Sequence, residues 1–226
     1  MKRIIILGVL FFIGLLIVSP VSAEGEKIVC IDPGHGGNTG AYNAMYNLWE
    51  DEIVLDISYR LKALLEPAGY QVGMTRTDNT NKSNGDRYNY CNSINADILL
   101  SAHINGSNNP DIDGSMALYF DGDDKILAQT IYNVMYPTLR DDPRVQWGFT
   151  NFGLTKFASG VLIKSNMPAA LMEPVLMSYN PEALLLVDMS NTSRRQMITQ
   201  TYFDGIINYF ANYSGGSGGN PGKGKP

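Results

Sequence analysis

Apolar and polar residues follow one another along the chain in blocks that predict strands and helices in turn. Residues 27–32 (KIVCID) form a short apolar run that ends at Pro33, which is typical of a buried strand. Over 50–66, apolar side chains recur at helical spacing, which predicts a helix with one buried face that ends before Pro67. Further along, the pattern predicts strands over 70–75, 97–103, 115–120, 160–163 and 169–172, and helices over 86–95, 125–139, 181–187 and 194–210.

This alternation of strands and helices predicts an α/β fold. A sheet of parallel strands, covered by helices on both faces, is the usual result of such a pattern. Residues 24–212 are expected to form a single domain. From residue 213 the chain is expected to be a flexible tail, because 214–226 contain only Gly, Ser, Asn, Pro and Lys.

The first residues have a different character. Lys2 and Arg3 precede an apolar run over 4–18, and small residues follow up to Ala23. This order predicts a secretory signal peptide over 1–23. An uncleaved anchor is the second choice, because a membrane span needs roughly 20 apolar residues. The protein is therefore expected to be secreted and to act at the cell envelope, without a stable membrane partner after cleavage.

The charge balance limits the class of ligand. The chain has 22 acidic and 17 basic side chains, a net charge of −5. An acidic protein without basic runs is a poor candidate for nucleic acid, because that binding depends on neutralising phosphates. The same balance gives no general attraction to an anionic cell wall, so recognition must come from a local site. Nothing in the pattern indicates an oligomeric state.

Cys30 and Cys91 are the two cysteines of the chain. Export permits a disulfide between them. However, Cys30 lies within an apolar strand, where a thiol more often behaves as a small buried hydrophobic group. The sequence leaves the pairing open and favours the free thiol.

Four groups with catalytic potential are placed at the ends of predicted elements. The two histidines, His35 and His103, lie just after or at the end of predicted strands, and Glu173 follows the strand 169–172. Glu50 begins the first helix, beyond the loop that carries His35. In open α/β sheets, ligands bind beyond the carboxyl ends of the strands. We therefore expect these four side chains to meet at one edge of the sheet.

Two imidazoles and one carboxylate are a common ligand set of catalytic Zn²⁺, with water in the fourth position. Binding to zinc lowers the pKa of water to roughly 7. A second carboxylate can take the proton of that water and pass it to a leaving nitrogen. Hydrolysis of an amide needs both the activated water and the proton transfer, since the amide carbonyl is a weak electrophile and the amide nitrogen is a poor leaving group.

Each of these residues also has a purely structural interpretation. His103 could be satisfied by hydrogen bonds at a strand end, and His35 could be exposed in a tight turn. Three neighbouring glycines favour a functional His35, because they let the backbone bend and leave room for a ligand. Glu173 could pair with Arg76 or Arg87. Its apolar flanks favour instead a raised pKa, which suits a general base.

The acidic start of the first helix leaves the third ligand open. Asn47 and Glu50 have the spacing of a capping box, which is a structural role for Glu50. Asp51 and Glu52 are also acidic, in a position that the helix dipole favours. Position alone does not separate the three acids as ligands.

Five segments together resemble a known family, the zinc-dependent N-acetylmuramoyl-L-alanine amidases of the amidase-3 type. The segments are 31–37 (IDPGHGG), 50–57 (EDEIVLDI), 75–78 (TRTD), 96–105 (ADILLSAHIN) and 167–173 (MPAALME). The likeness runs from about residue 28 to 210, which is most of the expected domain.

The resemblance implies a mixed, mostly parallel twisted sheet, one zinc ion and hydrolysis of the amide between N-acetylmuramic acid and L-alanine in peptidoglycan. By matching motifs it places the zinc ligands on His35, Glu50 and His103, and the catalytic carboxylate on Glu173. It thereby selects Glu50 from the three acids. Such an enzyme would be an autolysin that lyses or remodels the cell wall.

The chain departs from the family pattern in two places. Asp51 stands where the family usually has a lysine, and residues 174–176 (PVL) replace a small residue, Gly and Phe. Pro174 fixes the backbone beside Glu173.

Two other functions were weighed. A zinc exopeptidase is disfavoured because His35 and Glu50 lie far apart in sequence rather than on one loop. A catalytically silent wall-binding module would be expected to lack a ligand or Glu173, and the chain has them all.

Overall fold

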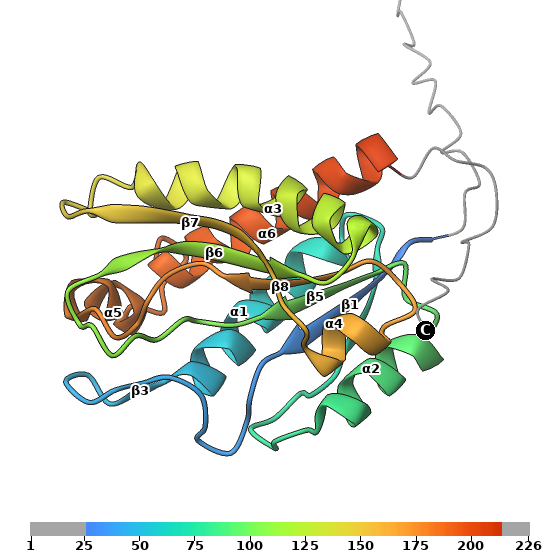
Figure 1. The fold of residues 1–226 in the computed structure, drawn as a ribbon, viewed down its shortest axis with the longest axis horizontal. Helices are drawn as coiled ribbons and strands as arrows, with labels where there is room; N and C mark the ends of the chain where they lie inside the picture. Colours follow the sequence, from blue (N-terminus) through green and yellow to red (C-terminus); the bar gives the residue numbers. More distant parts are fainter. Residues whose placement is uncertain (1–25, 214–226) are drawn as a thin grey trace, which may run out of the picture.

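Six strands form one sheet in the computed structural model, which describes residues 26–213 (Figure 1). The predicted signal peptide and the tail beyond residue 213 lie outside the described residues. The strand order is β4-β1-β5-β8-β6-β7. The strands are β1 (Ile28–Pro33), β4 (Gln71–Met74), β5 (Ile98–Ala102), β6 (Asp113–Tyr119), β7 (Phe149–Lys156) and β8 (Ala169–Glu173). The predicted α/β class, with a mixed and mostly parallel sheet between helices, is confirmed.

The sheet topology gathers three strand ends at one edge. β1 pairs in parallel with β4 and β5, and β5 pairs in parallel with β8. The only antiparallel pair of this described sheet is β6 with β8. Pro33 lies opposite Ala102, and Ala102 lies opposite Met172. Pro33, Ala102 and Met172 are therefore level in the sheet, and the residues that follow them lie at the same edge.

Helices cover both faces of the sheet and enclose two cores. The larger core lies beneath α1 (Glu50–Leu65), α3 (Gly122–Arg140) and α6 (Arg194–Tyr213), and the smaller one beneath α2 (Asn84–Ser93) and α4 (Gly160–Lys164). Ile98 and Leu100 belong to the larger core and Leu99 to the smaller one, as the period of a strand requires. The short α5 (Asn180–Val187) precedes α6. Within residues 26–213, every helix is too short or too polar to cross a membrane.

A disulfide joins Cys30 of β1 to Cys91 of α2 within the smaller core. The two Cα atoms are 5.7 Å apart. The free-thiol interpretation favoured from the sequence is wrong. The alternation along β1 turns Cys30 toward the same face that α2 covers, and no local pattern in the sequence reveals that pairing.

Several element predictions were wrong. Residues 160–163 form the start of helix α4 rather than a strand, because a short apolar run does not distinguish the two. The edge strand β7 was missed, since its sequence FTNFGLTK has little apolar periodicity. A small hairpin of β2 (Tyr42–Asn43) and β3 (Leu48–Trp49) was also missed. The N-cap of α1 is Trp49, without a side-chain cap, so the capping box with Asn47 is wrong.

Candidate metal centre and active site

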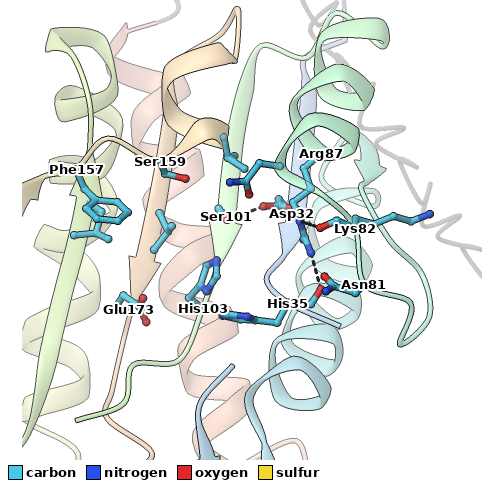
Figure 2. A pocket seen from close by; sticks show the side chains of 14 residues that line it. Asp32, His35, Asn81, Lys82, Arg87, Ser101, His103, Phe157, Ser159 and Glu173 are labelled. Atoms are coloured by element: carbon cyan, nitrogen blue, oxygen red, sulfur yellow. Dashed lines mark hydrogen bonds and ion pairs between the residues drawn. The ribbon is translucent and has the colours of Figure 1, made fainter. Parts of the chain in front are cut away.

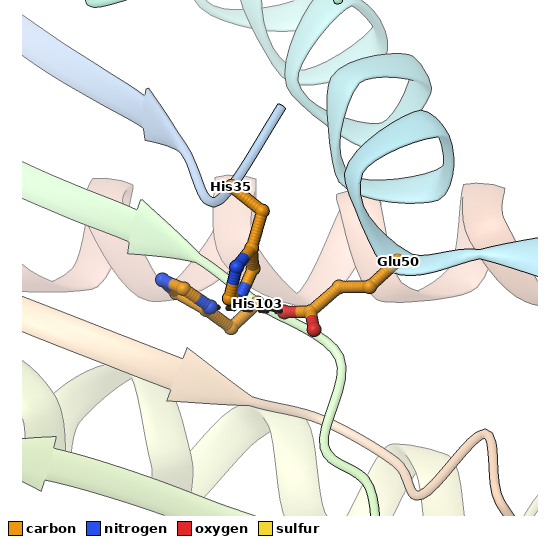
Figure 3. A group of neighbouring side chains, drawn as sticks. All are labelled: His35, Glu50 and His103. Atoms are coloured by element: carbon orange, nitrogen blue, oxygen red, sulfur yellow. Dashed lines mark hydrogen bonds and ion pairs between the residues drawn. The ribbon is translucent and has the colours of Figure 1, made fainter. Parts of the chain in front are cut away.

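The loop that carries His35 has an unusual backbone. His35 and Asn38 adopt φ angles of 57° and 58°, and Gly36, Gly37 and Gly40 also have positive φ. Non-glycine residues held in such regions cost about 1–3 kcal/mol each and persist where the surroundings enforce them. The loop turns sharply after β1 and directs the His35 ring toward the start of α1 (Figure 3).

Glu50 is held by backbone groups from two other segments. Its Oε2 accepts a hydrogen bond from the Ala41 amide at 2.7 Å, and its Oε1 accepts one from the Ile104 amide at 3.0 Å. The Glu50 amide in turn donates to the Ala41 carbonyl at 2.9 Å. The β2–β3 hairpin thus returns the chain so that the first residue of α1 faces the strand ends.

The structure brings His35, Glu50 and His103 together (Figure 3). His103 follows β5, and its amide donates to the Met172 carbonyl of β8 at 3.0 Å. Its Nδ1 lies 2.9 Å from Glu50 Oε1, and His35 Nε2 lies 3.2 Å from the same oxygen. One ligand atom from each residue lies within 4.8 Å of the others. Of the three neighbouring acids, Glu50 is the one that reaches this cluster.

Two glycines make this convergence sterically possible. A Cβ at position 34 would lie 2.4 Å from His103 Cε1, and a Cβ at position 40 would lie 2.5 Å from Glu50 Oε2. No side chain fits at either position without moving a member of the cluster. Sequence reasoning gave the glycines beside His35 the roles of bending the loop and leaving room for a ligand, whereas Gly34 and Gly40 leave space for the His103 and Glu50 side chains.

The electrostatics of the cluster suit a cation. Burial acts to raise the pKa of Glu50, but hydrogen bonds and charge interactions with His103 and His35 outweigh it and hold the pKa below its usual range. Glu50 is therefore ionised, as a metal ligand must be. Two imidazole nitrogens and one carboxylate oxygen form the donor set of a catalytic zinc site. The cluster thus fits one such ion.

Glu173 ends β8 at the same edge and lines the same pocket as His35 and His103 (Figure 2). Burial raises its pKa well above the usual value, and the negative charge of Glu50 adds to the effect. Its Oε2 is shielded from solvent and has no hydrogen-bond partner among the described residues.

The alternative interpretation of Glu173, an ion pair with Arg76 or Arg87, is wrong. Arg87 pairs with Asp32, and Arg76 donates to backbone carbonyls.

The pocket has a volume of about 370 Å³. Figure 2 shows Phe157 and Glu173 on one side, His35 and Asn81 on the other, and His103 between them. The Phe157 side chain is 49% exposed. Further lining groups come from α2, α4 and the neighbouring strands, namely Asn84, Ser159, Val161, Leu118 and Leu171. Sequence reasoning missed these wall residues as parts of the site, because none of them has an acidic or imidazole side chain.

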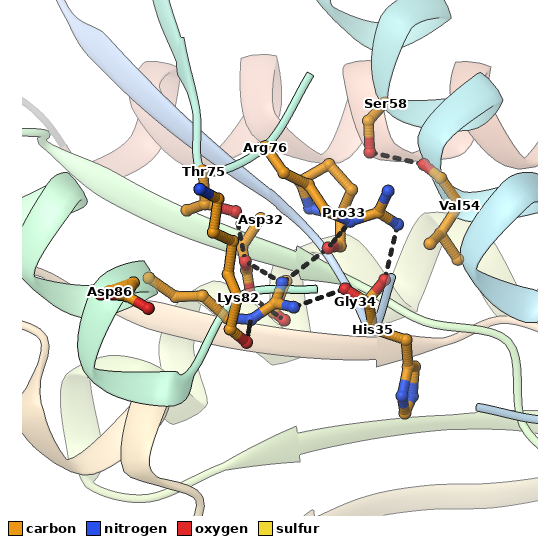
Figure 4. A network of polar contacts seen from close by, with 12 residues as sticks. Asp32, Pro33, Gly34, His35, Val54, Ser58, Thr75, Arg76, Lys82 and Asp86 are labelled. Carbon is orange, nitrogen blue, oxygen red and sulfur yellow. Dashed lines mark hydrogen bonds and ion pairs between the residues drawn. The ribbon is translucent and has the colours of Figure 1, made fainter. Parts of the chain in front are cut away.

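A buried polar network supports the strand end beneath His35 (Figure 4). Asp32 accepts hydrogen bonds from Thr75 Oγ1 at 2.5 Å, Arg87 Nη1 at 2.8 Å and Ser101 Oγ at 2.7 Å. Arg87 also donates to the His35 carbonyl at 2.6 Å. Arg76 donates to the Gly34 carbonyl at 2.7 Å. These side chains satisfy the carbonyl groups that the turn leaves without ladder partners.

The fold and the site define a class of protein, an α/β domain with a sheet edge that can hold one metal ion beside a carboxylate of raised pKa. A profile of the N-acetylmuramoyl-L-alanine amidases matches residues 29–208. The chain belongs to this family.

Individual relatives agree with this assignment. The chain is 28% identical over 192 residues to a "Probable cell wall amidase LytH" from Staphylococcus aureus, and 27% identical over 188 residues to that of Staphylococcus saprophyticus. These matches cover 83% and 82% of the chain, and 60% and 59% of those proteins. The chain therefore spans less than two thirds of the length of these relatives.

Solved structures share the fold. An N-acetylmuramoyl-L-alanine amidase from Clostridium difficile 630 is similar with a TM-score of 0.73 and 27% identity, over 83% of this chain and 98% of that one. The amidase AmiC2 of Nostoc punctiforme is similar with a TM-score of 0.71 and 30% identity, over the same shares of the two chains, 83% and 98%. Both similarities cover nearly the whole of the solved chains.

Proposed function

We propose that the protein is a zinc-dependent N-acetylmuramoyl-L-alanine amidase. Its reaction would be hydrolysis of the amide between N-acetylmuramic acid and L-alanine in peptidoglycan. The observation that carries this proposal is the convergence of His35, Glu50 and His103 in the pocket that Glu173 also lines. Membership of the amidase family adds the substrate class.

The residues that would hold the ion are His35 through Nε2, Glu50 through a carboxylate oxygen and His103 through Nδ1. Bound zinc would supply Lewis-acid activation of water and of the amide carbonyl. The Ala41 and Ile104 amides keep the Glu50 carboxylate in place, so that its orientation does not depend on the ion alone.

Glu173 would be the group that moves protons. As a base it accepts a proton from the attacking water, and as an acid it returns this proton to the amide nitrogen that leaves. Its raised pKa, caused by burial and by the charge of Glu50, favours the return step. A cation held by Glu50 would neutralise its charge and so remove the smaller of the two causes, which would lower the pKa of Glu173 toward the range where it also serves as a base.

We also place the protein outside the cytoplasm, as the predicted signal peptide requires. The Cys30–Cys91 disulfide supports this location, because such bonds persist in oxidising compartments. Peptidoglycan is then the substrate that the protein would meet.

Digestion of purified sacculi, followed by mass analysis of the soluble products, tests the proposed bond. We expect free stem peptides that begin with an L-alanine amino group, and no product after treatment with a chelator. Peptides cut within the stem would indicate a peptidase instead. Intact sacculi, with a zinc-loaded and folded enzyme, would contradict the proposal.

A further inference from the structure

Asp51, the residue after Glu50, is a buried carboxylate to which the reaction gives no part. Its side chain is fully buried. Its Oδ2 accepts hydrogen bonds from the Asn38 amide at 2.7 Å and the Thr39 amide at 3.4 Å. Its Oδ1 is buried without a hydrogen-bond partner in the described part of the chain. A carboxyl group buried with so few hydrogen-bond partners costs free energy, which calls for a reason beyond packing.

The two amides belong to the loop that carries His35. From His35 to Gly40, five of the six residues have positive φ, two of which are not glycine. Such a backbone does not hold itself in place, because His35 and Asn38 have more favourable conformations elsewhere and the glycines are free to adopt many. The position of the His35 ring therefore depends on the contacts that hold this loop.

These contacts divide between the two ends of the loop. Arg76 and Arg87 bind the carbonyls of Gly34 and His35, at the end that leaves β1. Beyond His35, the Asp51 carboxylate binds the Asn38 and Thr39 amides, and Asn79 binds the Gly37 amide and the Asn38 side chain. Of the contacts to residues 36–39, the Asp51 contact is the one that comes from helix α1, and the next contact with α1 is that of Ala41 with Glu50. Asp51 directly follows Glu50 in the chain. It therefore links the loop that carries His35 to the backbone that carries Glu50.

We propose that Asp51 is a positioning residue for the metal centre. By holding the Asn38 and Thr39 amides, it fixes the His35 loop relative to Glu50, so that the ligand set is assembled before the ion binds. This inference rests on the proposed function for the identity of the ion as zinc. Ligands that are already in place lose less conformational freedom on binding, which strengthens affinity.

Three variants test the proposal, with zinc affinity measured by competition against a chromogenic chelator. Asp51→Ala removes the acceptor, and we expect zinc affinity to fall by about 10- to 100-fold, as for other groups that orient metal ligands. Asp51→Asn keeps one acceptor oxygen and is expected to restore most of the affinity. Glu52→Ala removes the neighbouring, exposed carboxylate from the same helix turn and is expected to leave the affinity unchanged.

Hydrogen exchange of the metal-free wild-type protein provides a test that needs no variant. We expect the Asn38 amide to be protected, and to lose this protection in Asp51→Ala while the core strands keep theirs. An Asn38 amide that exchanges freely in the metal-free wild type would overturn the proposal, even if Asp51→Ala does not fold. A folded Asp51→Ala protein with unchanged zinc affinity would overturn it as well.

These outcomes are separable from failure of the proposed function. If the wild-type protein binds no zinc, the proposed metal centre fails. If it binds zinc and cuts sacculi while Asp51→Ala binds zinc equally well, only the positioning role of Asp51 fails.

Discussion

At the scale of single residues, the site depends on neighbouring glycines as much as on the side chains of the cluster. The His103 ring packs directly over Gly34, and the Glu50 carboxylate and the His35 ring pack over Gly40. An imidazole can lie so close to a backbone only where no Cβ intervenes. These contacts explain the glycine at position 34, whose φ is not positive, and give a second reason for the glycine at position 40, whose φ is positive.

Gly34→Ala should therefore damage the site without unfolding the protein. The new Cβ would lie 2.4 Å from His103 Cε1, so that the ring must move. Displacement of a catalytic group by about 1 Å costs on the order of 100-fold in turnover, and we expect a loss of this size or larger on soluble muropeptides. Gly122→Ala is the matched control, because nothing lies within 4 Å of a Cβ there. Equal turnover in the two variants would refute the steric role of Gly34.

Glu173→Gln should separate metal binding from proton transfer. Glutamine has the same shape as glutamate but cannot take a proton from water. We expect zinc content to be unchanged and turnover to fall by about 100- to 10,000-fold, which is the usual contribution of a general acid–base group. Zinc analysis and product release, measured on one preparation, check both halves. Retained hydrolysis would show that the base lies elsewhere.

At the scale of elements, the sequence was most informative where periodicity was long or where buried strands were bounded by glycine or proline. Helix α1 and strands β1, β5 and β8 lie within a residue or two of their predicted bounds. The sequence of α4 predicts a strand, because an apolar run of four residues fits either structure. β7 was missed because an edge strand has one pairing partner and an exposed face, which weakens the alternation of apolar residues.

The disulfide should stabilise the element that leads to His35. It closes a loop between positions 61 residues apart and fastens β1 to α2. A cross-link of this kind typically contributes about 2–4 kcal/mol, mainly by restricting the unfolded chain. Urea unfolding with and without reductant is expected to show a difference of that size in the free energy of unfolding. The control is a Cys30→Ala/Cys91→Ala double variant, whose free energy of unfolding is expected not to change with reductant. An equal stability of oxidised and reduced wild-type protein would contradict the assigned bond.

At the scale of the whole molecule, the site is a product of topology. His35, His103 and Glu173 are far apart in sequence, yet parallel pairing of β1, β5 and β8 brings their strand ends to one edge. This much could be predicted, because parallel strands share the edge at which they end. The residues that form the walls of the pocket could not be predicted. Phe157 and Asn81 lie beyond the edge strand and before α2, where neither periodicity nor a motif relates them to the site.

The contacts that hold the cluster in place could not be predicted from the sequence either. Asp51 looked like one of three interchangeable acids at a helix start, and its contacts to Asn38 and Thr39 depend on a loop backbone that no local pattern specifies. The pairing of Cys30 with Cys91 also depended on which face of the sheet α2 covers. Residue types indicated the chemistry, whereas three-dimensional packing decided which side chains take part.

Zinc content is the most direct test of the central claim, that two imidazoles and one carboxylate at this sheet edge hold a catalytic ion. Elemental analysis of the purified wild-type chain, beside a folded His35→Ala variant, makes the comparison. We expect close to one zinc per chain in the wild type and almost none in the variant. A wild-type protein that remains metal-free in zinc-containing buffer, or a variant that keeps the full amount, would contradict it.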